Sequence, residues 1–139
     1  MLFSAKAEYA CLAVMELAVR HGDQKPVRLP EIADRHGIPH RFLVQILLQL
    51  KGAGLVASTR GAAGGYHLAR DPAEITLADV LDVVDPPESA GSGRKGDVSA
   101  MLAALRDKWD EITAARKQIL ESTTVADLVA AGQGIQYVI

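Results

Sequence analysis

Residues 30–69 read PEIADRHGIPHRFLVQILLQLKGAGLVASTRGAAGGYHLA, and this stretch decides the fold. Its first seven residues predict a short helix, because proline is favoured in a first helical turn and Gly37 stands just past the end. A tight connection over 37–39 then leads into a helix from His40 to about Gly52. The apolar residues of that helix recur at helical spacing, at Leu43, Ile46, Leu47 and Leu50.

The second half of this stretch predicts a β-hairpin. Residues 55–59 and 66–69 read as two short strands, and residues 60–65 (RGAAGG) form a glycine-rich turn between them. Glycine permits the positive φ angles that hairpin loops often need. Two helices followed by a hairpin predict a winged helix-turn-helix, whose second helix lies in a DNA major groove and whose hairpin is the wing.

A helix is also expected before this stretch, beginning at the capping residue Ser4 and running to about Arg20. Between Tyr9 and Val19 its only charged residue is Glu16. A helix that is apolar on nearly all sides is usually covered on more than one side. The second cover is expected to come from either the C-terminal helix or a partner subunit.

Three more helices are expected after the hairpin. Thr76 caps one that runs to about Asp85, a long one spans about 98–122, and Thr124 caps a short one that ends near Ala131. The small and polar residues 86–97 separate the first two as a flexible loop. The predicted fold is therefore mainly α with a small β-hairpin wing, divided into a winged helix-turn-helix domain over 1–85, this loop, and a C-terminal part over 98–139.

The charges are unevenly divided along the chain. Residues 1–70 contain nine Lys and Arg against five Asp and Glu, whereas residues 71–139 contain six against twelve. This division predicts that the first half meets an anionic partner, the alternative being a chance asymmetry in a small protein. No apolar run is long enough to cross a membrane, no signal peptide is recognisable, and the single cysteine, Cys11, cannot form an internal disulfide. We therefore expect a cytoplasmic protein.

The face of the second helix turned away from its apolar stripe holds the candidate base contacts. These are Arg41, Val44, Gln45 and Leu48, with His40 at the helix start. Glutamine pairs with an adenine edge, arginine with guanine, and valine with a thymine methyl. We expect Leu48, farther along the helix, to pack inside rather than to reach the bases.

Basic side chains outside that face are candidate backbone contacts. Arg60 opens the glycine turn, and the negative potential of a narrow minor groove attracts an inserted arginine. Lys51, Arg28 and Lys6 are candidate phosphate contacts. The alternative is that these are ordinary solvated surface residues.

The sequence resembles the Rrf2 family of winged-helix regulators, which includes IscR, NsrR and CymR. The residues that carry the resemblance are GLVASTRG at 54–61, GGYHLAR at 64–70, ITLADVL at 75–81, and the opening of the first helix with Glu31-Ile32-Ala33. The resemblance implies a homodimer whose long helix pairs with its mate, and mostly repression at partly palindromic operators. It also implies DNA contacts at Arg41, Gln45 and Arg60. Ala62 and Ala63 depart from the proline and glycine that the family often has in the wing.

Many members of that family bind an iron–sulfur cluster through three cysteines before the long helix. Here residues 86–101 contain neither Cys nor His, and thiolates are the usual ligands of such clusters. Glu8 matches an acidic ligand that some relatives use, but it has no thiolate partners. Cys11 is expected to be a small buried hydrophobe. We therefore expect no metal or cofactor.

Two functions of different classes follow. The first is a sequence-specific DNA-binding regulator, a homodimer without a cluster that responds to a small molecule or a partner protein. The second is a protein–protein adaptor that kept the fold but not DNA binding, which the apolar Val44 and Leu48 would suit. No arrangement of nucleophile and base supports an enzyme. The apolar tail over 135–139 has no assigned role.

Overall fold

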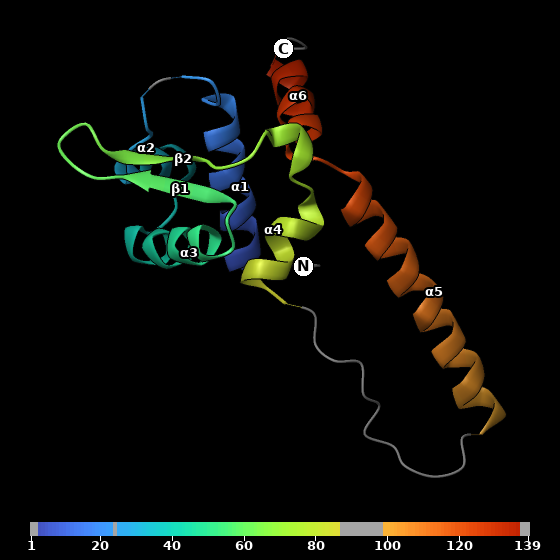
Figure 1. Cartoon of the computed structure of the whole chain (residues 1–139). Helices are drawn as coiled ribbons and strands as arrows, with labels where there is room; N and C mark the ends of the chain where they lie inside the picture. The colour runs from blue at the N-terminus through green and yellow to red at the C-terminus, as the bar shows by residue number, and fades with distance from the viewer. Residues whose placement is uncertain (1–2, 24, 87–98, 137–139) are drawn as a thin grey trace.

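A first helix, α1 (Ala5–Val19), runs through the middle of the body in this computed structural model, which describes residues 3–23, 25–86 and 99–136 (Figure 1). It begins as predicted, because the Ser4 hydroxyl accepts a hydrogen bond from the Ala7 N–H at 3.1 Å. Its buried residues are mostly small, and contacts reach it from α2, α3, α4, α6 and the hairpin. The expected cover on more than one side is therefore present, and part of it comes from the last helix, α6.

The helix-turn-helix consists of α2 (Leu29–His36) and α3 (His40–Gly52). Gly37 lies between them in the left-handed region, at φ 65°, which lets the chain turn sharply after α2. Leu43, Ile46, Leu47 and Leu50 of α3 are fully buried. The predicted helices and their core stripe are thus confirmed.

The wing is an antiparallel hairpin of β1 (Val56–Thr59) and β2 (Gly65–Leu68), with Val56 opposite Leu68. Gly61 adopts φ 108° in the turn. A Cβ on Gly64 would overlap the Thr59 carbonyl, and one on Gly65 would overlap the carbonyl of Val27, which pairs with Tyr66. The turn therefore needs glycine for three separate steric reasons.

Two helix-capping segments, one after the wing and one after the long helix, are hydrogen-bonded to each other and so attach the C-terminal half to the body. The short η1 (Pro72–Glu74) precedes α4 (Leu77–Val84), and Thr76 and Asp79 exchange hydrogen bonds of 3.0 and 3.1 Å at its start. Thr124 and Asp127 do the same for α6 (Val125–Gln136). The Leu77 N–H donates to the Thr123 carbonyl at 2.9 Å, and the Val125 N–H donates to the Ile75 carbonyl at 2.8 Å. These bonds hold the two helix starts side by side.

The last helix is longer than predicted. We expected it to end near Ala131, before Gly132, but α6 continues to Gln136. Glycine inside a helix costs about 1 kcal/mol relative to alanine. The side chains of residues 131–133 are exposed, so burial does not explain the extension.

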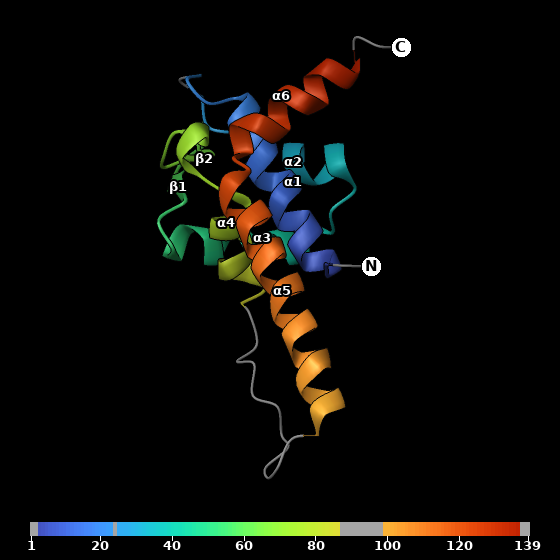
Figure 2. The same cartoon turned by 90° about the vertical axis from the view of Figure 1, so that its right-hand side faces the viewer.

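The long helix α5 (Ala100–Ser122) leaves the body at an angle and extends well beyond it (Figures 1 and 2). None of its residues is buried. Five of its large apolar residues are exposed, namely Met101, Leu105, Trp109, Ile112 and Ile119, whereas Leu102 and Leu120 are half-buried. The loop expected at 86–97 and the end of the apolar tail lie outside the described residues, except for Pro86. No helix in the described part of the chain is both long and apolar enough to span a membrane.

Candidate nucleic-acid interface

The outward face of α3 is formed by Arg41, Gln45 and Leu48. These positions lie opposite the buried stripe when successive residues are spaced 100° around the helix. All three side chains are exposed, and within the described residues Arg41 and Gln45 make no hydrogen bond or ion pair with another side chain. Their donors are therefore available to an external partner.

The prediction that Leu48 packs inside is wrong, because its side chain is 59% exposed. The inner side of α3 is already filled by Leu47 and Leu50, which are fully buried. Position 48 points within about 20° of Arg41 around the helix, away from the buried stripe, and so cannot reach the core. Phe42, on the flank of the helix, is also exposed, at 53%.

The other predicted residues of α3 lie beside this outward face. His40 Nε2 is 3.2 Å from Asp34 Oδ1, which links the start of α3 to α2. The Lys51 ammonium donates to the Ser58 hydroxyl at 2.7 Å and so ties the end of α3 to β1. Val44 is 40% exposed on the same side as Lys51. This flank of α3 therefore faces the wing.

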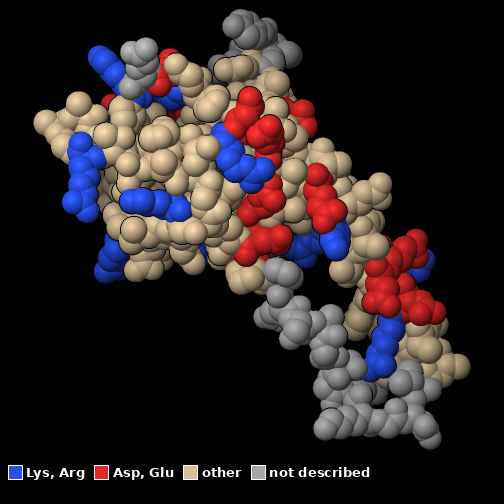
Figure 3. All heavy atoms as spheres, viewed as in Figure 1, with Lys and Arg blue, Asp and Glu red and all other residues tan. Residues whose placement is uncertain are grey.

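Arg60 follows β1 directly and is exposed at the start of the wing turn. The structure thus brings the predicted residues of α3 and of the adjoining hairpin to one end of the molecule, whereas Lys6 lies on α1 and Arg28 precedes α2. On the face shown in Figure 3, Lys and Arg side chains lie over this end, whereas Asp and Glu side chains gather over α4, and both signs of charge occur along α5. A polyanion would be attracted to the first region and repelled by the second.

A buried carboxylate connects the centre of the fold to the helix-turn-helix. Glu16 of α1 is only 5% exposed, and its Oε1 is 2.9 Å from His36 Nε2. Its Oε2 lies 3.4 Å from Arg35 Nη1 and 3.7 Å from Arg20 Nε. The sequence analysis did not assign Glu16 a role, although a lone charge in an apolar helix is a signal that such a residue has polar partners.

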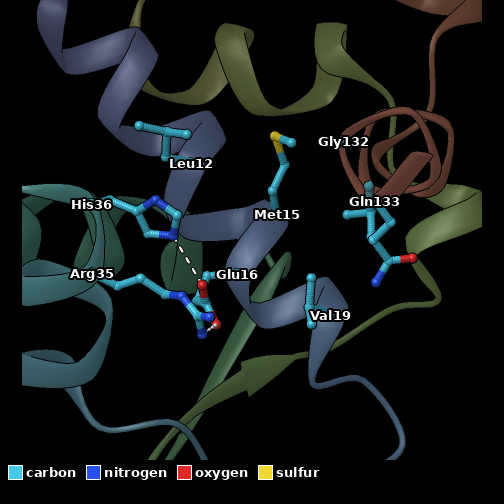
Figure 4. Close-up of a pocket in the computed structure, with 9 residues that line it drawn as sticks. Leu12, Met15, Glu16, Val19, Arg35, His36, Gly132 and Gln133 are labelled. Atoms are coloured by element: carbon cyan, nitrogen blue, oxygen red, sulfur yellow. Dashed lines mark hydrogen bonds and ion pairs between the residues drawn. The ribbon is translucent and has the colours of Figure 1, made fainter. Parts of the chain in front are cut away.

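Beside this carboxylate, α1, α2 and α6 enclose a cavity of about 260 Å³ (Figure 4). Its wall is largely apolar, with polar groups on the α2 side. The lining residues are Leu12, Met15, Glu16, Val19, Arg35, His36, Val129, Gly132 and Gln133. The cavity therefore touches both the central helix and the first helix of the helix-turn-helix.

Comparisons with known proteins agree on one family. The family model Rrf2, described as an iron-dependent transcriptional regulator, matches residues 3–131. A Mycobacterium tuberculosis protein named as an HTH-type transcriptional regulator is 44% identical over 92% of this chain and 81% of its own length. The HTH-type transcriptional regulator CymR of Bacillus subtilis is 36% identical over 98% of this chain and 95% of its own length.

Solved structures show the same similarity. The structure of B. subtilis CymR, described as the global cysteine regulator of that organism, has a TM-score of 0.82 at 35% identity, over 94% of this chain and 98% of its own. T. potens IscR has a TM-score of 0.80 at 33% identity, over 98% of this chain and 91% of its own.

The iron in the family's description can be tested against the donors of this chain. The chain has one cysteine, and residues 87–98, outside the described ranges, contain no Cys or His. Burial, and then the nearby Glu8 carboxylate, raise the pKa of the Cys11 thiol from 9.0 to about 11. In the described part of the chain, no three His, Cys, Asp or Glu residues are grouped to hold a metal ion. These residues do not fit an iron–sulfur cluster, whose ligands are thiolates.

The raised pKa predicts that Cys11 is unreactive in the folded protein. Only the thiolate attacks an alkylating agent, and two pKa units reduce its fraction at pH 7 by about 100-fold. Iodoacetamide should therefore label native protein about 100-fold more slowly than protein unfolded in urea, as followed by mass spectrometry. Equal rates in the two states would contradict this account of the thiol.

Proposed function

The chain belongs to the Rrf2 family of transcriptional regulators, and we propose that it acts as a cluster-free homodimer that represses transcription at a partly palindromic operator. It is a DNA-binding regulator and not an enzyme. The observation that supports the proposal most directly is the exposed pair Arg41 and Gln45 on α3, with Arg60 on the adjoining wing. We infer that it works in the cytoplasm, where bacterial DNA is.

Base recognition is assigned to the outward face of α3. A guanidinium donates two hydrogen bonds to guanine O6 and N7, and a carboxamide pairs with adenine N6 and N7. Arg41 and Gln45 lie about one turn, or 6 Å, apart along the helix, so they address base pairs about two steps apart. Val44 adds an apolar contact on the wing side, and His40 stands at the end of the helix that enters the groove first.

The backbone contacts are assigned to the wing and its neighbours. Arg60 extends from the start of the turn and suits a narrow minor groove, where negative potential is concentrated. Lys51 holds the Ser58 hydroxyl and leaves other ammonium hydrogens for a phosphate. These contacts position the protein and carry little sequence information.

We assign dimerisation to α5. The chain then consists of a DNA-binding domain over 1–85 and a dimerisation part over 98–139. A free helix with exposed Trp109, Ile112 and Ile119 on one side is poorly stable in water, and a second copy of α5 would cover that side. A two-fold dimer presents two copies of α3 to successive major grooves, about 34 Å apart. A palindromic operator matches that symmetry.

The alternative is an adaptor that uses the same face to bind a protein. The exposed Phe42, Val44 and Leu48 favour it, because apolar side chains are common at protein interfaces. The positive charge around them favours DNA instead.

An effector is assigned to the cavity between α1, α2 and α6. Its volume of about 260 Å³ is near the lower limit of known ligand sites, which suits a small metabolite. The paired Glu16 carboxylate on its wall would accept a hydrogen bond from that metabolite. Because Arg35 and His36 belong to α2, a ligand here would act on the helix that positions α3.

The DNA proposal predicts that Gln45→Ala and Arg60→Ala weaken binding to the operator by about 5- to 150-fold each, the value of one good contact. The operator is located by footprinting the DNA beside the gene, and affinities are measured by fluorescence anisotropy. Lys108→Ala, on α5, is the matched control and should bind as the unmodified protein does. Unchanged affinity in both test variants would favour the adaptor.

The dimer proposal predicts that Ile112→Asp yields single chains, because it places a charge in the apolar side of α5. Sedimentation equilibrium measures the mass. Ala114→Asp introduces the same charge on the opposite side of the helix and should remain a dimer. A dimeric Ile112→Asp variant would exclude this face as the interface.

The effector proposal predicts that Gly132→Leu blocks the cavity. A Cβ at Gly132 meets no atom within 4 Å, so the larger side chain enters open space. The small-molecule fraction of a bacterial extract should raise the melting temperature of the unmodified protein but not that of Gly132→Leu. In the absence of extract, Gly132→Leu should bind the operator as the unmodified protein does. An equal rise in both proteins would place the ligand elsewhere.

A further inference from the structure

Leu48 is the apolar member of the outward face of α3 and lies at the edge of that face nearest Val44. It is 59% exposed and shares the outward side of α3 with Arg41 and Gln45. A single exposed leucine is common on protein surfaces. This one, however, lies about one turn beyond Gln45 and two turns beyond Arg41 on the same side of the helix, so DNA that covers those two side chains extends over Leu48.

A second observation extends the apolar surface. Val44 is 40% exposed and precedes Leu48 by four residues, so the two side chains are neighbours on the helix. Together they form an apolar edge on the wing side of Arg41 and Gln45. The major groove offers one apolar group to such an edge, the C5-methyl of thymine.

We propose that Leu48 is a specificity-determining residue that packs against a thymine methyl, at a base pair beyond those read by Arg41 and Gln45. The proposal rests on the function proposed above. From Arg41 to Leu48 the helix advances about 10 Å, which corresponds to roughly three base-pair steps of 3.4 Å. The face therefore selects, in order along one half-site, a guanine, an adenine and a thymine.

The test removes single methyl groups from the DNA. Each thymine of a half-site is replaced in turn by uracil, which forms the same base pair without the methyl. The unmodified protein should lose about fourfold in affinity at the thymine that Leu48 contacts, the effect of one buried methyl. Leu48→Ala should bind the thymine operator more weakly and show no further loss with uracil at that position.

Two variants of the same helix serve as controls. Val44→Ala should lose its sensitivity at a different thymine and keep it at the one assigned to Leu48. Phe42→Ala, which removes an exposed side chain from the other flank, should keep both sensitivities. Because Leu48 is exposed, the melting temperature of Leu48→Ala should match that of the unmodified protein.

The outcomes distinguish a failure of this proposal from a failure of the proposed function on which it rests. If the unmodified protein binds its operator but no uracil position matters, or if Leu48→Ala keeps the full uracil effect, Leu48 does not read thymine. Equal weakening of Leu48→Ala on every duplex would assign the residue to backbone contact or to stability and would also overturn the proposal. If the unmodified protein bound the operator and unrelated DNA equally well, that result would contradict the proposed function itself.

Discussion

The burial of α1 on several sides is the constraint on which the rest of the structure depends. Ala7, Ala10 and Ala13 let neighbouring helices approach closely, and α4 and α6 take up two of those positions. The backbone bonds between the 75–77 and 123–125 segments then fix where α4 and α6 begin. The long helix α5 ends where α6 begins, beside the 75–77 segment, and its exposed apolar side lies outside the core.

The same central helix also controls the DNA-binding end. Glu16 is the charged residue in the apolar part of α1. Its carboxylate is paired with Arg20 at the end of the same helix and with Arg35 and His36 of α2. Because Arg35 and His36 both contact this buried carboxylate, the cluster holds α2 against α1. Because α2 and the left-handed Gly37 set the direction of α3, the orientation of the recognition helix depends on a contact far from its exposed face.

In the function proposed above, the reading of DNA and the sensing of a signal take place at separate sites. The exposed face of α3 combines hydrogen-bonding side chains with the apolar Val44 and Leu48, so it can discriminate bases by two kinds of contact. The sensing chemistry of iron-binding relatives needs thiolates, which a single, protonated cysteine does not supply. A cavity that borders α2 offers instead a route by which binding energy could act on the recognition helix.

The sequence by itself determined the features that rest on local chemistry. Ser4, Thr76 and Thr124 begin helices because their hydroxyls accept nearby N–H groups, and Gly37, Gly54 and Gly61 turn the chain because they tolerate positive φ. The residues on the outward face of α3 also followed from helical periodicity. Only the tertiary structure decided what depends on distant neighbours: the exposure of Leu48, the partners of Glu16, and the exposed side of α5. Burial is a property of the packed arrangement, and residues close in sequence carry little information about it.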